Sequence, residues 1–82
     1  PQQLTNVEVD DKDATLSAPA VVAAVQTVTE RLGDEGRILL RKSGTEPVLR
    51  VMVEAGTHEL CEENVAYVID VMRKSGHLIR VR

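Results

Sequence analysis

The segment Arg41 to Pro47, which reads Arg-Lys-Ser-Gly-Thr-Glu-Pro, together with Arg50 contains the residue types that bind phosphate. Arginine offers a planar fork of donors that matches phosphate oxygens bidentately. Ser43 and Thr45 add hydroxyl donors, and the glycine between them lets backbone N–H groups approach an anion closely. The pattern predicts a phosphate clamp with these candidate contacts: Arg41, Ser43, Gly44, Thr45 and Arg50.

Two strands must position this clamp. Residues 36–42 and 48–54 both alternate in the manner of strands, and the short loop between them predicts an antiparallel hairpin. If Leu40 pairs with Leu49, the apolar faces match, and Arg41 and Arg50 lie on the opposite face as diagonal neighbours about 7–8 Å apart. A slip of one residue would turn Arg50 toward the core, which the apolar pattern forbids.

An ordinary hairpin turn is the alternative interpretation, because Ser, Gly, Thr and Pro are all turn residues. Local chemistry leaves both interpretations open. Strand alternation places Lys42 on the core face, so it is a weaker candidate for a phosphate contact than the two arginines. Ser43 has no histidine near it in the sequence to act as a base, which argues against a nucleophile.

The charge distribution supports a discrete anion site. The chain has a formal net charge of −3. Residues 1–36 carry seven acidic and two basic residues, whereas residues 37–53 carry four basic residues against Glu46 alone, a net charge of +3. A positive segment in an acidic protein fits one bound anion, although four solvated surface bases would give the same count.

The composition excludes several classes of function. The chain contains no Phe, no Trp and one Tyr, so it lacks the stacking platforms of a general single-strand nucleic-acid binder. Its acidic balance argues against binding to nucleic acid or to an anionic membrane. The single cysteine, Cys61, excludes an internal disulfide and fits a reducing, cytoplasmic location. The chain begins at Pro1, and we expect it to be a piece of a larger protein.

The remaining pattern predicts a small α+β fold in one domain, residues 1–82. We expect a strand at residues 4–9, a polar loop over residues 10–14, a helix capped by Ser17 and ending at Gly33, a helix capped by Thr57 and ending at Gly76, and a last strand at residues 78–81. The order is β-α-β-β-α-β, which predicts a mostly antiparallel four-stranded sheet with two helices on one face.

No metal site is predicted. His58 and Cys61 lie three residues apart on the expected second helix, but two ligands without a third are a weak signal, and Cys61 belongs to the apolar stripe. The acidic residues at positions 10, 11 and 13 are expected to be solvated, and His77 is expected to be exposed.

The segment Gly36 to Glu54 resembles the phosphate-binding segment of the α-D-phosphohexomutases. The run from Arg41 to Pro47, followed by Arg-Val-Met-Val-Glu at residues 50–54, is most similar to the bacterial phosphoglucosamine mutases. The resemblance implies that the whole chain is the TATA-binding-protein-like (TBP-like) C-terminal domain of a larger multidomain enzyme. In that family it is the last of four domains and swings over the active-site cleft to hold the phosphate that is not reacting.

The resemblance also implies an activity for the larger protein. Such an enzyme interconverts glucosamine 6-phosphate and glucosamine 1-phosphate through a bisphosphate, in the synthesis of amino-sugar precursors of peptidoglycan. It uses a phosphoserine and Mg²⁺, and both lie outside this chain. The expected partners are the phosphosugar and the other domains of the same protein, with neither nucleic acid nor membrane among them.

Within this chain the resemblance implies that Arg41, Ser43, Gly44, Thr45 and Arg50 contact the phosphate and that no residue is catalytic. The fragment alone is therefore expected to be inactive. A carboxylate beside a phosphate is repulsive unless it orients an arginine, so Glu46 has no contact assigned. The alternatives are a phosphomannomutase or phosphoglucomutase C-terminal domain, or a non-enzymatic module that binds an anion or a protein.

Overall fold

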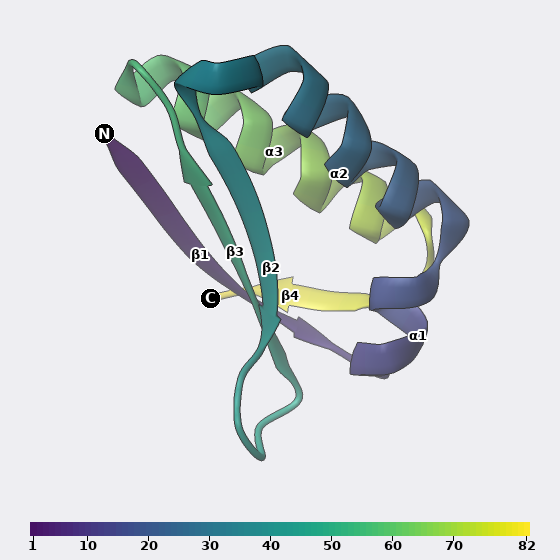
Figure 1. Cartoon of the computed structure of the whole chain (residues 1–82). Helices are drawn as coiled ribbons and strands as arrows, with labels where there is room; N and C mark the ends of the chain where they lie inside the picture. Colours follow the sequence, from purple (N-terminus) through teal and green to yellow (C-terminus); the bar gives the residue numbers. More distant parts are fainter.

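The computed structural model describes all 82 residues. Four strands form one sheet, and the helices cover one of its faces and leave the other open (Figure 1). The elements follow in the order β1 (Gln2–Val9), α1 (Lys12–Ser17), α2 (Pro19–Leu32), a short 3-10 turn (Gly33–Glu35), β2 (Arg37–Lys42), β3 (Val48–Glu54), α3 (His58–Lys74) and β4 (Leu78–Val81).

The sheet has the strand order β2-β3-β1-β4, and all three pairings are antiparallel. β1 and β3 occupy the middle, so the first strand of the chain lies beside both the third and the last strand. The α+β class and the antiparallel four-stranded sheet are therefore as predicted. This order brings the C-terminus, at β4, to the same sheet as the β2–β3 hairpin.

The core lies between the sheet and the two long helices. Alternate residues of the central strands point inward, and the apolar stripes of α2 and α3 pack on them, as their helical spacing predicts. The buried residues of this layer include Val7, Val9, Val21, Val28, Leu49, Val51, Val53, Cys61, Val65, Val68 and Met72. Because these strand residues face the helices, their neighbours in sequence, Arg50 among them, lie on the open face.

One helix was not predicted. The polar segment after β1 was expected to be a loop, but residues 12–17 form α1, with the Asp11 side chain accepting a hydrogen bond from the Ala14 N–H at 2.9 Å. Ser17 was expected to cap the following helix and instead ends α1, where its hydroxyl donates to the Asp13 carbonyl oxygen. The residue before Pro19 caps α2 without a side-chain hydrogen bond.

The third helix begins and ends as predicted. The Thr57 hydroxyl oxygen accepts from the Leu60 N–H at 3.1 Å, which satisfies one of the free donors of the first turn. The helix ends at Lys74, and Gly76 has φ 88°, a left-handed conformation that favours glycine. β4 then returns along β1.

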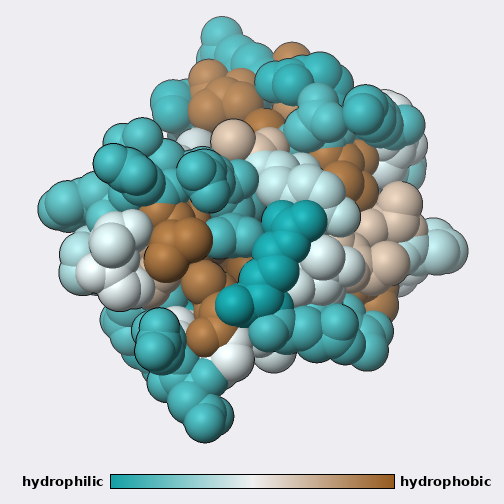
Figure 2. Space-filling view, turned by 90° about the horizontal axis from the view of Figure 1, so that it is seen from above, coloured by the Kyte–Doolittle hydropathy of each residue, from teal (hydrophilic) through white to brown (hydrophobic).

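Apolar side chains reach the surface in separate areas. Figure 2 shows them, on the face seen from above, as brown areas among hydrophilic residues. The large exposed apolar residues are Leu4, Val22, Leu60, Ile79 and Val81. No helix has both the length and the apolar character needed to span a membrane.

Candidate anion-binding site

Arg41 and Arg50 lie directly opposite each other in the β2–β3 hairpin. The prediction that they share the open face is confirmed, but the expected diagonal register is wrong by two residues, since Leu40 pairs with Val51. A shift of two keeps every side chain on its face. The loop has the expected bounds, residues 43–47. At its end the Pro47 carbonyl oxygen accepts from the Val9 N–H at 2.9 Å.

The two arginines have no acidic partner. Both are exposed, and none of the ion pairs in the structure includes either of them. Arg37, on the same strand and the same face, is instead 3.4 Å from the carboxylate of Glu54. Like charges directly across a strand pair are destabilising. The hairpin therefore holds an unneutralised pair of guanidiniums about 5 Å apart at their Cα atoms.

A shallow hollow of about 280 Å³ lies on the open face beside this pair. Three of its five lining residues are apolar, and the two arginines are the charged ones. The hollow is lined by Leu4, Leu39, Met52, Arg41 and Arg50. The two guanidiniums make this hollow complementary in charge to a small anion.

The loop between β2 and β3 presents free backbone donors. The Ser43 N–H donates to the Val48 carbonyl oxygen at 3.0 Å and is occupied. The N–H groups of Gly44, Thr45 and Glu46 donate to no acceptor in the protein. Gly44 has no positive φ, and a Cβ built there meets nothing within 4 Å. The glycine is thus not required by the backbone conformation, and the space beside it is open.

Helix α1 holds the loop from the helix side. The Lys12 ammonium donates to the carbonyl oxygens of Ser43 at 3.2 Å and of Gly44 at 3.1 Å. The next residue, Asp13, pairs with the ammonium of Lys42 at the base of the loop. That hydrogen bond and charge hold the pKa of the Asp13 carboxyl below its ordinary value. Lys42 thus points to the helix side, as its strand parity predicts.

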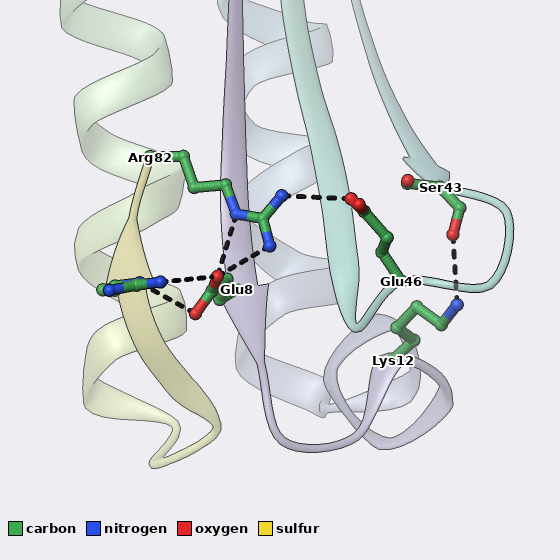
Figure 3. A network of polar contacts seen from close by, with 6 residues as sticks. Glu8, Lys12, Ser43, Glu46 and Arg82 are labelled. Carbon is green, nitrogen blue, oxygen red and sulfur yellow. Dashed lines mark hydrogen bonds and ion pairs between the residues drawn. The ribbon is translucent and has the colours of Figure 1, made fainter.

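The C-terminal residue holds the loop from another element. Arg82 donates to the Glu46 carboxylate at 3.0 Å and to the Glu8 carboxylate at 2.7 Å, and Arg80 donates to Glu8 as well (Figure 3). These hydrogen bonds hold the pKa of the Glu8 carboxyl below its ordinary value. The hydrogen bond to Glu8, with a smaller one to Glu46, raises the pKa of Arg82. Glu46 therefore orients an arginine, which is how a carboxylate can lie near a phosphate site without simple repulsion.

The other residues considered as possible metal ligands do not form a site. Cys61 is buried and His58 is exposed, and no group of three or more His, Cys, Asp or Glu residues could hold a metal ion. The three acidic residues after β1 do not act together. Asp11 caps α1, Asp13 pairs with Lys42, and Asp10 lies 2.8 Å from Nδ1 of His77. The expectation that His77 is simply exposed is thus wrong, because it is half-buried and bonded.

Sequence reasoning missed three contributors to the site: Lys12, Glu8 and Arg82. Each contacts a residue that is more than 30 positions away in the chain. Only the strand order and the position of α1 bring them to the loop. The basic character of the last residues was visible in the sequence but gave no indication of a partner.

Comparison with known proteins identifies the fold and its family. A family model described as the phosphoglucomutase/phosphomannomutase C-terminal domain matches residues 4–76. The chain belongs to this family. The resemblance found in the Arg41–Pro47 segment is thereby confirmed.

Named relatives of this phosphohexomutase C-terminal domain agree with that assignment. The phosphoglucosamine mutase of Lachnospira eligens is 52% identical over 79 residues, covering 96% of this chain and 18% of the relative. The phosphoglucosamine mutase of Mycobacterium marinum is 51% identical over 76 residues, covering 93% and 17%. The chain therefore spans less than a fifth of the length of these curated relatives.

A solved structure shares the architecture of this C-terminal domain. The structure of Aspergillus fumigatus N-acetylphosphoglucosamine mutase matches with a TM-score of 0.72 and 29% identity, over 93% of this chain and 16% of that chain. The predicted α+β class with an antiparallel sheet is confirmed by this likeness, with α1 as an addition to the expected elements.

Proposed function

We propose that residues 1–82 form the substrate-phosphate-binding, C-terminal domain of a phosphoglucosamine mutase. The larger protein would interconvert glucosamine 6-phosphate and glucosamine 1-phosphate through a bisphosphate. This domain would hold the phosphate that is not reacting, through Arg41, Ser43, Gly44, Thr45 and Arg50. The observation that carries the proposal is the unpaired arginine pair at Arg41 and Arg50, beside a loop with free N–H groups.

The energetics of the hairpin support an anion as the ligand. Two guanidiniums held opposite each other repel in the free domain. A phosphate between them replaces that repulsion with charge-assisted hydrogen bonds, which are shorter and stronger than neutral ones. Phosphate binding is therefore favoured by relief of the repulsion between the two guanidiniums, which destabilises the free domain.

The same geometry suits the non-reacting end of a sugar phosphate. Binding energy at a group remote from the chemistry orients the substrate and can be used in the transition state. A clamp that accepts either phosphate of the bisphosphate as the sugar turns must recognise phosphate and tolerate both orientations of the ring. We therefore assign sugar selectivity to other parts of the longer protein.

The family resemblance implies Mg²⁺ in the complete enzyme. The acidic residues of this chain do not fit such a site, because no three potential ligands come together. The contribution of this domain is accordingly to bind and orient, and the chain by itself is expected to be inactive.

Removal of either arginine tests the proposal. We expect Arg41→Met and Arg50→Met each to weaken the binding of glucosamine 6-phosphate by about 10- to 100-fold, the range for a lost charge-assisted hydrogen bond. Arg37→Met is the matched control, since it removes the same charge from the same strand and face but from a residue paired with Glu54. Amide NMR titration gives both the affinities and a check of folding. Equal weakening by all three variants, or by none, would contradict a clamp at Arg41 and Arg50.

A further inference from the structure

A single ammonium group fixes two consecutive peptide units of the loop. Lys12 Nζ lies 3.2 Å from the carbonyl oxygen of Ser43 and 3.1 Å from that of Gly44. The two carbonyls therefore converge on one ammonium group on the α1 side of the loop, and Figure 3 shows the contact of Lys12 with Ser43. Lys12 is half-buried, and the contact crosses more than 30 residues of sequence.

The planarity of the peptide bond converts this contact into a direction for the N–H groups. In a trans peptide the C=O and the following N–H point in opposite directions. The N–H of Gly44 belongs to the same peptide as the Ser43 carbonyl, and the N–H of Thr45 to the same peptide as the Gly44 carbonyl. With both carbonyls turned toward Lys12, both N–H groups are turned away from it.

The two N–H groups are also free. Neither donates to an acceptor in the protein, and the space beside the Gly44 Cα is open. Successive backbone N–H groups that point to one side form a concave anion site of the kind called a nest. The loop therefore presents two free donors on the side away from Lys12, and the contact with α1 holds their peptides in place.

The first turn of α1, which contains Lys12, is itself held by hydrogen bonds and an ion pair. The buried Thr15 donates through Oγ1 to the Asp11 carbonyl oxygen at 2.7 Å, and Asp11 caps the helix. Asp13, beside Lys12, binds Lys42 at the end of β2. The first turn of α1 is thus tied both to the strand and to the loop, which limits the freedom of the loop peptides before any ligand binds.

We propose that Lys12 is a positioning residue for phosphate binding. It orients the N–H groups of Gly44 and Thr45 toward the anion and does not touch the anion itself. This inference rests on the proposed phosphate-binding function. It assigns part of the affinity to α1, an element outside the Arg41–Arg50 segment that carries the family pattern.

The test compares Lys12→Met with Lys12→Arg and with Lys74→Met. Methionine keeps most of the side-chain stem and removes the donors, and arginine restores a charged donor. Lys74→Met removes the same charge at a distant site, where Lys74 pairs with Asp70 at 3.0 Å. Inorganic phosphate and glucosamine 6-phosphate are titrated into the 82-residue chain at about 0.05 M and about 0.5 M salt, so that simple charge attraction is screened in the second series.

We expect Lys12→Met to weaken phosphate binding about fivefold at both salt concentrations relative to Lys74→Met, and Lys12→Arg to restore most of the loss. Without ligand, the amide signals of Gly44 and Thr45 should move and their hydrogen exchange should change in Lys12→Met alone. Affinity equal to that of Lys74→Met, or a loss that disappears at high salt, would overturn the positioning role. If the unaltered chain does not bind phosphate, the proposed function fails with it, whereas the changes in the unliganded Gly44 and Thr45 signals still report whether Lys12 orients the loop.

Discussion

Arg82 lies 3.0 Å from Glu46 and thereby joins the end of the chain to the loop between β2 and β3. The same guanidinium binds Glu8 on β1, which lies between β3 and β4 in the sheet. The phosphohexomutase motif therefore does not hold its own loop alone. Arg82, which directly follows β4 and is bound to Glu8 of β1, fixes one side of it, and Lys12 fixes the other.

Arg82→Met should loosen the loop without unfolding the domain. Exposed ion pairs contribute little to stability, so the loss should appear as motion and not as a large change in unfolding free energy. We expect lower ¹⁵N heteronuclear NOE values at Thr45 and Glu46. Arg80→Met is the matched control, because Arg80 binds the same Glu8 but does not contact Glu46. Equal loop motion in the two variants would show that the Arg82–Glu46 contact does not restrain the loop.

Glu8 should contribute to the acid sensitivity of the fold. Hydrogen bonds from Arg80 and Arg82 hold its pKa below the ordinary 4.5. A depressed carboxyl pKa adds stability that is fully present above the unfolded value and is lost as the pH falls through the folded value. Urea midpoints measured from about pH 7 to about pH 3 should therefore fall more steeply for the unaltered chain than for Glu8→Gln.

Glu30→Gln provides the comparison for that experiment, since Glu30 is exposed on α2 and forms no ion pair. Between about pH 7 and about pH 3, the urea midpoint of Glu30→Gln should fall as steeply as that of the unaltered chain. If the urea midpoints of Glu8→Gln and Glu30→Gln fell equally steeply with pH, the ion pairs of Glu8 would not account for the acid sensitivity.

Gly36→Ala should destabilise the hairpin, although its φ of −169° suits any residue. A Cβ at this position would lie 2.2 Å from the Glu54 carbonyl oxygen, so β2 and β3 must separate at this end. We expect a loss of about 1–3 kcal/mol, the range for overpacking. Gly44→Ala is the control, with open space and no positive φ, and should leave the urea midpoint unchanged. Equal midpoints for both variants would argue against the close contact.

The elements that follow hydrophobic periodicity could be predicted from the sequence. The alternation of Leu49, Val51 and Val53 gave β3, and the stripe from Cys61 to Met72 with Thr57 as cap gave α3. α1 could not be predicted in this way, because it is short and polar and depends on the Asp11 cap and on contacts with the distant loop. Local pattern carries no information about such contacts.

The site shows the same division. The alternation of side chains along a strand placed Arg41 and Arg50 on one face, since the apolar residues next to each of them in sequence must face the core. The alternation does not fix the register, because a shift of two residues keeps every side chain on its face, and the observed pairing differs from the expected one by two residues. The contacts of Glu46 and Lys12 depend on the strand order β2-β3-β1-β4 and on the position of α1, which single residues do not specify.

The central claim is that Arg41 and Arg50 together bind the phosphate of a phosphosugar. The most direct measurement follows the arginine side-chain Nε–H signals in ¹⁵N NMR during titration with glucosamine 6-phosphate. Glucosamine, which lacks the phosphate, is the control. The controls are Arg37, which pairs with Glu54, and Arg31, whose guanidinium lies 4.6 Å from the centroid of the Tyr67 ring. We predict that the signals of Arg41 and Arg50 shift together with one affinity, that those of the two control arginines stay in place, and that glucosamine shifts none of them. Unmoved Arg41 and Arg50 signals at saturating phosphosugar, or equal shifts at all four arginines, would contradict the account.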